Sequence, residues 1–461
     1  MMKHTNDLGK DPIFPLVLRL AIPTMLAQFV CVLYSIVDRM YIGAGVGDLA
    51  LAGVGVCAPI VTLLSSFASL IGLGGSPIMA MRMGAGDERE AQKILNNSFF
   101  MLLVTSVLLT FGFLALKEKF LMWFGASQAT FAYANTYVTI YTLGTLFALL
   151  STGMNSFLIA QGFSGLGMVT VMLGAVLNIV LDPVFIFGFH MGVAGAAVAT
   201  VISQLASAVF VLVSLRGKRM PIRLGWGGFA KQTMRKIISF GFSPFLIIAS
   251  DSILLIVLNT VLQRYGGPGE GDILVTCATI VQSYLLIITM PMSGITLGSQ
   301  PVVSFNYGRG DAGRIRKAIW CITGLCVIFC SLMMVFTYTL SPLYVSMFTK
   351  DAEIKLRSVR YIKVFTAMIV PLAVQYPLVD ETTALGHVKR ALFCSAFRKL
   401  IYFSCLILLP MLVSAEAAFL SEPAADVIAA TMTTVLFLKT FPGIVRETEA
   451  MEKAKEKKGQ I

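Results

Sequence analysis

Two stretches decide the fold: SLIGLGGSPIMAMRMGAGDEREAQKIL (residues 69–95) and SGITLGSQPVVSFNYGRGDAGRIRKAI (residues 293–319). They align without gaps at an offset of 224 residues, and nine of the 27 positions are identical. The identical pairs are Ser69/Ser293, Ile71/Ile295, Leu73/Leu297, Gly74/Gly298, Pro77/Pro301, Gly84/Gly308, Gly86/Gly310, Asp87/Asp311 and Lys93/Lys317. The same offset pairs Tyr137 with Tyr361, and Pro23 matches Pro244 within three residues of that register. The chain therefore contains an internal repeat.

The composition around the repeat is that of a membrane protein. Of the 461 residues, 57% are hydrophobic and 13% are charged, and the mean hydropathy is +0.82. Soluble domains carry about 25% charged residues. This deficit extends along almost the whole chain, which excludes a water-soluble enzyme and a disordered protein.

Twelve apolar stretches are long enough to cross a bilayer, which takes roughly 20 helical residues each. They lie near residues 14–41, 49–81, 94–116, 130–160, 166–189, 192–215, 238–262, 273–304, 315–340, 357–383, 390–412 and 415–438. The predicted fold is an all-α integral membrane protein with two parallel six-helix repeats, an arrangement typical of transporters with a substrate site between the halves. The expected parts are an N-terminal lobe (1–215), a linker loop (216–236), a C-terminal lobe (237–440) and a charged tail (441–461).

The basic residues predict the orientation. The net charge is +12, and most Lys and Arg lie in the two tails and in the loops on the same side as the tails, the linker 216–236 above all. Because cytoplasmic loops carry an excess of Lys and Arg, both termini are expected to be cytoplasmic. The eight cysteines lie in apolar runs without CxxC spacing, and no zinc pattern is present. No cofactor is therefore expected.

Ionisable side chains deep in apolar helices cost about 2.5–3.5 kcal/mol on insertion scales and are often functional. Asp38 lies late in the stretch 14–41, and Asn178 and Asp182 lie one helical turn apart in the stretch 166–189. Tyr137 and Thr200 fall at a similar depth. These five residues predict a coupling site that either holds Na⁺ in a cage of oxygens or shares one proton between two carboxyls.

Two prolines accompany this cluster. Pro183 follows Asp182 and leaves a carbonyl of the preceding turn free, and Pro23 is a candidate bend in the first stretch. The alternative interpretation gives the cluster no coupling role: Asp38 would pair with Arg39 at the interface, and Asn178 and Asp182 would hydrogen-bond between helices.

The second repeat holds further polar residues. Asp251, seven residues after Pro244, either faces a central cavity and attracts a cation or is solvated without a coupling role. Gln282 and Met290 are further candidates for the substrate cavity, since methionines suit adaptable apolar sites. For Asp380 and Glu381 a solvated interfacial position is favoured. The acids Glu416, Glu422 and Asp426 are weaker candidates for any role.

Several short motifs, taken in order, resemble the multidrug and toxic compound extrusion (MATE) family, and most closely its bacterial multidrug efflux subgroup. These are Asp38-Arg-Met-Tyr-Ile-Gly43, Gly241-Phe-Ser-Pro-Phe245, Gly298-Ser-Gln-Pro301, Asn306-Tyr-Gly308, Ala384-Leu-Gly386 and Lys389-Arg390. They span both repeats, so the resemblance covers nearly the whole chain.

The resemblance implies a V-shaped pair of six-helix bundles that exports amphipathic cationic drugs or toxins in exchange for H⁺ or Na⁺ by alternating access. It also implies a monomer in a bacterial inner membrane. Family members with an acidic N-lobe site use an Asp on helix 1 and an Asn-x-x-x-Asp pair on helix 5, which matches Asp38, Asn178 and Asp182. The sequence departs from the family at Asp251 and at Asp380-Glu-Thr-Thr383.

Three rival functions remain open at this point. A related flippase or exporter of a lipid-linked or endogenous metabolite would want more basic residues inside the lobes. An intramembrane prenyltransferase would need two Asp-rich clusters for Mg²⁺ and diphosphate, and Asn178-x-x-x-Asp182 is only one partial cluster. A channel would give no reason for the repeated lobes.

Overall fold

The computed structural model describes residues 6–267 and 269–457, and within these residues every regular element is a helix. Residues 1–5, and residues 458–461 of the predicted charged tail, lie outside the described part. The first repeat contains α1 (Ile13–Val46), α2 (Asp48–Gly84), α3 (Glu88–Trp123), α4 (Gln128–Leu143), α5 (Thr145–Ala160), α6 (Ser164–Pro183), η1 (Val184–Gly188) and α7 (Gly192–Arg216). The second contains α8 (Lys231–Gly266), α9 (Glu270–Arg309), α10 (Ala312–Ser346), α11 (Ala352–Phe365), α12 (Ile369–Ala384), α13 (Val388–Leu412), η2 (Ala415–Leu420) and α14 (Ser421–Lys457).

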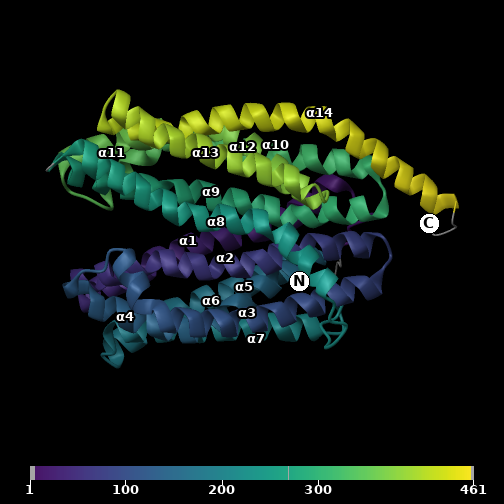
Figure 1. Ribbon diagram of the computed structural model, residues 1–461, viewed down its shortest axis with the longest axis horizontal. Coiled ribbons are helices and arrows are strands. Elements are labelled where there is room, and N and C mark those ends of the chain that lie inside the picture. The colour runs from purple at the N-terminus through teal and green to yellow at the C-terminus, as the bar shows by residue number, and fades with distance from the viewer. Residues whose placement is uncertain (1–5, 268, 458–461) are drawn as a thin grey trace.

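The helices form two lobes that lie side by side (Figure 1). Within the described residues, ten helices are long and apolar enough to cross a membrane, and two bent pairs raise the number to twelve. The bent pairs are α4 with α5 and α11 with α12, so each is the fourth crossing of its lobe. The all-α, two-lobed fold predicted from the repeat is confirmed.

The two bends are a feature that hydropathy alone did not predict. α4 and α5 meet at an angle of 57°, and α11 and α12 at 48°. The first break is at Gly144, where an added Cβ would lie 2.4 Å from a methyl carbon of Val201, so the backbones approach closely there. In the second pair, Pro371 lies in the first turn of α12. N–H groups in the first turn have no partner within the helix, so proline is tolerated there.

The lobes contact each other mainly through α1 with α9 and α2 with α8. Glycines make this seam possible in a symmetric way. A Cβ at Gly84 would lie 1.8 Å from the carbonyl oxygen of Phe305, and a Cβ at Gly308 would lie 1.8 Å from that of Met81. These residues are equivalent under the repeat offset of 224, so the two halves contribute the same contact reciprocally. Any larger residue at either glycine forces the backbones apart.

A short segment ahead of α1 connects the two lobes. Asn6 donates a hydrogen bond to the carbonyl of Gly162 in the first lobe, 2.8 Å away. Asn306 donates to the carbonyl of Leu8 at 2.9 Å, and Arg314 donates to that of Asp11 at 2.8 Å, both from the second lobe. We call residues 6–11 the N-terminal bridge. It lies at the same end of the bundle as the tight glycine contacts of the seam.

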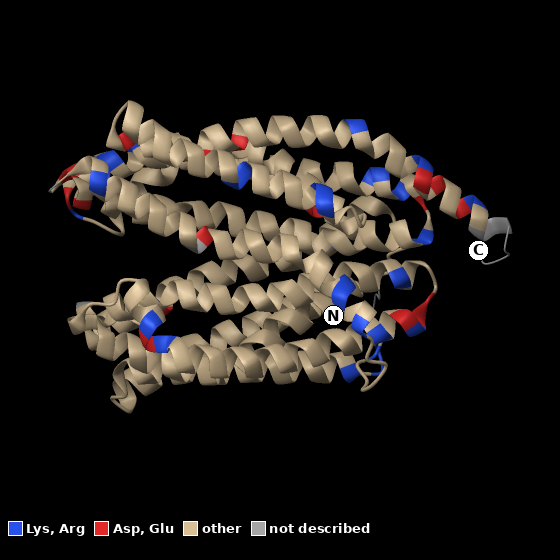
Figure 2. Ribbon diagram, viewed as in Figure 1, with Lys and Arg blue, Asp and Glu red and all other residues tan. Residues whose placement is uncertain are grey.

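Charged residues gather at both ends of the bundle, and Lys and Arg are more abundant at this end, toward which both termini also lie (Figure 2). We call it the basic end. It includes the connection from α7 to α8, where Asn96 and Asn97 of α3 hydrogen-bond the backbone of residues 225–230. α8 begins at Lys231, so the last six residues of the stretch predicted as linker are helical.

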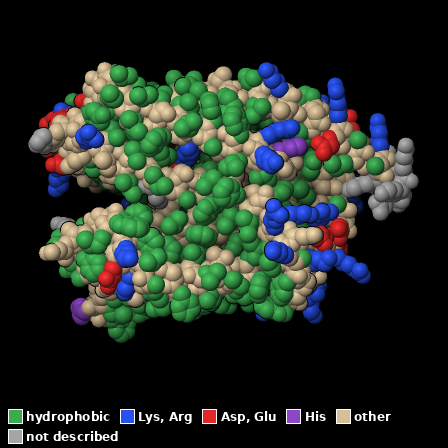
Figure 3. All heavy atoms as spheres, in the orientation of Figure 1, with side chains coloured by type: hydrophobic (Ala, Val, Ile, Leu, Met, Phe, Trp, Pro, Cys, Tyr) green, Lys and Arg blue, Asp and Glu red, His purple; other side chains and the backbone are tan. Residues whose placement is uncertain are grey.

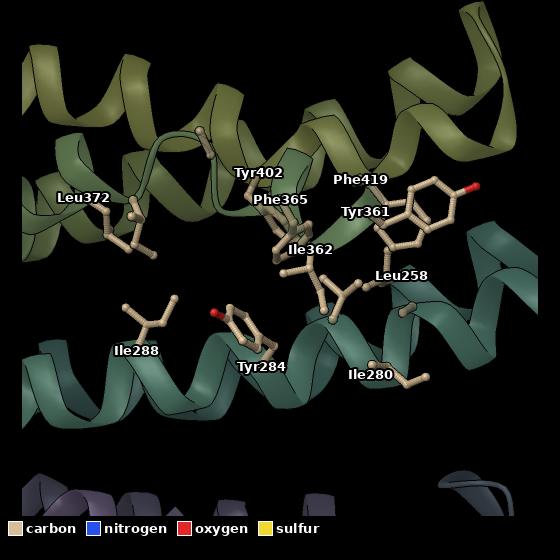
Figure 4. Packing of buried hydrophobic residues seen from close by; sticks show 14 of the residues in the cluster. Leu258, Ile280, Tyr284, Ile288, Tyr361, Ile362, Phe365, Leu372, Tyr402 and Phe419 are labelled. Atoms are coloured by element: carbon tan, nitrogen blue, oxygen red, sulfur yellow. The ribbon is translucent and has the colours of Figure 1, made fainter. Parts of the chain in front are cut away.

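Each lobe has its own apolar packing. In the second lobe the buried side chains of α8, α9, α11, α13 and η2 form one cluster, part of which is shown in Figure 4. Tyr361 and Phe419 stack there with ring centroids 4.1 Å apart and planes 7° apart. Because the lobes pack internally in this way, the space between them toward the end opposite the basic end is left less filled, and the molecule is hollowed there (Figure 3).

Candidate functional site

The five residues predicted for the coupling site come together in the N-terminal lobe. Asn178 and Asp182 lie on one face of α6, and the Asn178 amide donates to the Asp182 carboxylate at 3.2 Å. The same amide lies 3.3 Å from the hydroxyl of Thr200 on α7. The Asn178–Asp182 contact lies within one helix rather than between helices, whereas Thr200 provides the link to the next helix.

Asp38 of α1 lies within hydrogen-bonding reach of Asp182. Two carboxylates can share a hydrogen bond only when one of them carries a proton. Asp182 is fully buried, and no Lys or Arg in the described residues forms a salt bridge with either acid. The salt bridge between Asp38 and Arg39 that the alternative interpretation required is not formed, although Arg39 still acts on Asp38 electrostatically.

Three oxygen atoms in this cluster are buried and have no hydrogen-bond donor within the described residues. They are Oδ1 of Asp38, Oδ1 of Asn178 and Oδ2 of Asp182. Buried acceptors are normally paired, so these three oxygens are exceptions to that rule. Across the described chain, however, no group of three or more His, Cys, Asp or Glu side chains could hold a metal ion.

Tyrosines form one wall of the cluster. Tyr137 of α4 is buried, interacts electrostatically with Asp38, and stacks on Tyr141 with centroids 6.1 Å apart. Gln204 of α7 lies 3.4 Å from the Tyr141 hydroxyl. Tyr34, one turn before Asp38 on α1, also interacts with it. The sequence reasoning missed Tyr34, Tyr141 and Gln204, although each lies four residues from a predicted site residue on the same helix.

The two prolines of the first lobe differ in their effect. Pro183 is the last residue of α6, and the chain continues as the π-helical turn η1. Single π-turns often occur at functional positions. Pro23 lies inside α1, which runs as one helix from Ile13 to Val46. The hydroxyl of Thr24, the next residue, donates hydrogen bonds to the carbonyl oxygens of Leu20 and Ala21.

The candidate cavity residues of the second lobe lie in a different electrostatic setting. Asp251 on α8 forms an ion pair with Lys399 on α13, and more than half of the Asp251 side chain is exposed. Gln282 and Met290 are partly buried on α9. Gln282 lies within hydrogen-bonding reach of Tyr402, the residue one turn after Lys399. The sequence suggested that Asp251 either attracts a cation on its own or is merely solvated. Neither interpretation included the basic partner that the structure shows.

A second ion-pair group lies deeper in the same lobe. Arg398 of α13 binds the carboxylates of Glu422 and Asp426 on α14, with a distance of 2.8 Å to Asp426. The exposed fractions of the three side chains are 16%, 11% and 1%. Glu422 and Asp426, which looked like weak candidates in the sequence, are therefore parts of a buried charge network. Figure 2 shows basic residues along α13 away from its ends.

The favoured solvated position is wrong for Glu381, whereas Asp380 is partly buried. Glu381 is fully buried on α12, and both of its carboxyl oxygens lack a hydrogen-bond partner in the described residues. Asp380 lies within hydrogen-bonding reach of Thr296 on α9. The stretch looked interfacial because it lies near the end of an apolar run, but α9 and α10 both pack against α12 and cover it.

The comparison with family models decides the identity, because the MatE model matches residues 23–184 and 247–404 and so takes in both lobes. The chain belongs to the MATE family. Multidrug export protein MepA of Staphylococcus saprophyticus is 24% identical to it over 347 residues, which cover 75% of this chain and 76% of that protein. MATE proteins are transporters, so the prenyltransferase alternative fails.

Solved structures of MATE-family and related proteins have the same fold. An outward-facing multidrug resistance MATE family transporter of the MOP superfamily superposes with a TM-score of 0.90 at 22% identity, covering 96% of this chain and 99% of that one. A MOP superfamily transporter from Pyrococcus furiosus, described as having a binding pocket of reversed polarity, gives 0.89 at 22% identity, with coverage of 96% and 99%. The chain is thus a multi-pass MATE-family membrane protein.

Proposed function

We propose that the protein exports amphipathic organic cations, including drugs and toxins, in exchange for H⁺ or Na⁺ by alternating access of the cleft between its lobes. The observation that carries this proposal is the pair of neighbouring carboxyls, the fully buried Asp182 and the partly buried Asp38, neither of which forms a salt bridge within the described residues. An acidic pair of this kind needs a mobile cation, and a proton or Na⁺ moving down its gradient supplies one.

Each neighbouring residue has a part in the proposed cycle. Asn178 and Thr200 fix the position of the Asp182 carboxylate through their hydrogen bonds, and Tyr137 closes the site beside Asp38. The contact between the carboxyls favours H⁺ as the coupling ion, because a shared proton is what permits that contact. Loading of the site changes the packing of α1, with Pro23 and Pro183 as the positions where α1 and α6 yield.

The surroundings of the protein belong to the same proposal. The basic end faces the cytoplasm, both termini lie there, and the protein is a monomer in the plasma membrane. The lobe boundaries are those given by the sequence: 1–215, a linker at 216–236, 237–440 and a tail from 441 to 461. MepA carries the name of a multidrug export protein, which supports drugs as the substrates.

An exporter of lipid-linked or endogenous metabolites is the second candidate, and one observation bears on it. Basic residues of the kind such a cavity needs are present at Arg398 and Lys399, but both are bound to carboxylates of the same lobe. The lobe therefore offers no unpaired positive surface at these two positions, which favours drug export.

Ethidium efflux from proteoliposomes tests the proposal. The purified protein should move ethidium under either an imposed pH gradient or an imposed Na⁺ gradient, and the effective gradient names the coupling ion. Asp182→Asn should reduce gradient-driven efflux to the level of empty liposomes. Efflux that is equally fast without any gradient, or undiminished in Asp182→Asn, would overturn the proposal.

A further inference from the structure

The ion pair between Asp251 and Lys399 joins two helices of the second lobe at the middle of their length. Lys399 is the twelfth residue of α13 (Val388–Leu412), and Asp251 lies ten residues past Gly241 along α8, or about 15 Å at the helical rise. Gly241 is a seam glycine, since a Cβ there would lie 1.7 Å from the carbonyl oxygen of Leu70. The pair thus lies beyond the tight part of the seam, on the side where the lobes separate (Figure 3).

The two partners are exposed to different degrees. The Asp251 side chain is 55% exposed and that of Lys399 is 19% exposed. The carboxylate is therefore the more accessible partner and the ammonium is the more enclosed one. Tyr376 and Tyr402 lie close enough to interact with Asp251 electrostatically.

Lys399 is the basic group that a ligand in the cleft can reach. Its neighbour Arg398 is directed toward α14, where Glu422 and Asp426 take up its charge. An anionic ligand group would have to replace two carboxylates to bind Arg398, but only one to bind Lys399. Successive residues of a helix point about 100° apart, which explains why the two cations have separate partners.

The pair discriminates between ligands by their charge. A ligand with only a positive charge can bind Asp251 only by displacing Lys399, whose ammonium then loses its salt bridge in a poorly solvated position and keeps only its longer-range attraction to Asp426. A ligand with both an ammonium and a carboxylate replaces the one internal pair by two new pairs and leaves no charge unmatched. Buried groups left unpaired are what generate selectivity of this kind.

We propose that the Asp251–Lys399 pair is a subsite for zwitterionic substrates, with Asp251 binding the cationic group and Lys399 binding the carboxylate. This proposal rests on the proposed efflux function and specifies one class of substrate for the same cleft. It assigns to Lys399 the role of a specificity-determining residue.

Two dyes that differ by a single methyl ester provide the test. Rhodamine 110 carries a free carboxylate, and rhodamine 123 is its methyl ester and a simple cation. Binding of each dye to the purified full-length protein is measured by fluorescence polarisation. The wild-type protein should bind rhodamine 110 at least about tenfold more tightly, since a charge-assisted contact of ordinary strength gives a ratio of that order.

The variants separate charge from folding. Lys399→Met should lower the preference for rhodamine 110 by about tenfold and strengthen binding of rhodamine 123, because Asp251 is released. Lys399→Arg should keep the preference. Asp251→Asn/Lys399→Met leaves no unpaired charge in the pair and should bind both dyes alike. Lys439→Met, which changes an exposed lysine of the same lobe, is the matched control and should behave as wild type.

The outcome that overturns the inference is an equal ratio of the two affinities in wild type and Lys399→Met, or a wild-type preference for rhodamine 123. Failure of the efflux function is a separate result, because it would be absence of gradient-driven ethidium export with the binding ratio still measurable. Loss of all dye binding in Lys399→Met, with binding retained in Lys399→Arg, would also contradict the inference, since Asp251 should still bind the simple cation.

Discussion

The two lobes place charge at corresponding helix pairs but treat it in opposite ways. In the first lobe α1 and α6 bring Asp38 and Asp182 together, and neither acid forms a salt bridge within the described residues. In the second lobe α8 and α13 bring Asp251 to Lys399, and Arg398 binds two further acids. The difference teaches that the two copies of a repeat can keep the same helix arrangement while their acids differ in whether they form ion pairs.

The largest expected effect comes from making the first lobe resemble the second. Asn178→Lys places an ammonium one turn from Asp182, so the acids gain a tethered partner that no gradient can exchange. Gradient-driven ethidium efflux should fall to the level of empty liposomes while the protein remains in the membrane. Asn178→Gln keeps the amide and is the matched control, with efflux clearly above that level. Full activity of Asn178→Lys would show that the acids need no exchangeable cation.

The reverse change tests whether the charges of the second lobe are structural. Arg398→Met leaves Glu422 and Asp426 buried without their cation, which should lower the free energy of unfolding by about 3–5 kcal/mol. Thermal unfolding in detergent measures this. The triple variant Arg398→Met/Glu422→Gln/Asp426→Asn removes all three charges and should recover most of the loss. If the single variant were as stable as wild type, the network would have no structural role.

The seam is where the lobes should behave alike. Gly84→Ala and Gly308→Ala both introduce a Cβ against a carbonyl oxygen of the other lobe, and each should destabilise the protein by about 1–3 kcal/mol, as overpacking does. Gly112→Ala, at a position with nothing within 4 Å, is the matched control. Unequal costs for the two seam glycines would indicate that the repeat is less symmetric in energy than in geometry.

The smallest expected effect concerns the N-terminal bridge. Asn6→Ala removes the hydrogen bond to Gly162, and a single neutral hydrogen bond contributes about 1 kcal/mol. Amide hydrogen exchange at residues 8–11 should therefore become a few times faster. Lys10→Ala, at an exposed residue of the same segment, should leave the exchange rates as they are. The bridge would be irrelevant to lobe contact if both variants exchanged alike.

The sequence predicted the repeat, the helices and the first-lobe cluster because each leaves a local signal. Asp38, Asn178 and Asp182 stand out as polar residues in apolar runs, and helical spacing places Asn178 and Asp182 on one face. The second bend could not be predicted in this way, since the break at residues 366–368 contains no glycine or proline, unlike the first break at Gly144. This break is defined by the start of α12, and where that helix starts depends on how it packs against its neighbours.

The ion pairs of the second lobe were not predicted, for a similar reason. Arg398 and Lys399 lie inside an apolar run, but their partners are on α14 and α8, between 24 and 148 residues away in the chain. Pairing across such distances is set by how the helices pack, which hydropathy does not report. Glu381 likewise looked solvated until α9 and α10 were seen to cover it.

Because the glycine seam lies at one end of the bundle, a small rotation of the lobes at the seam produces a large displacement at the opposite end. From Gly241 to the far end of α8 at Gly266 the helix extends about 37 Å, so a turn of only 10° at the seam moves that end by roughly 6 Å. A displacement comparable to the size of a drug molecule at the far end of α8 therefore requires only sub-ångström shifts of the atoms near Gly241. A bulky side chain would therefore change the angle between the lobes most strongly if it were introduced at the seam itself.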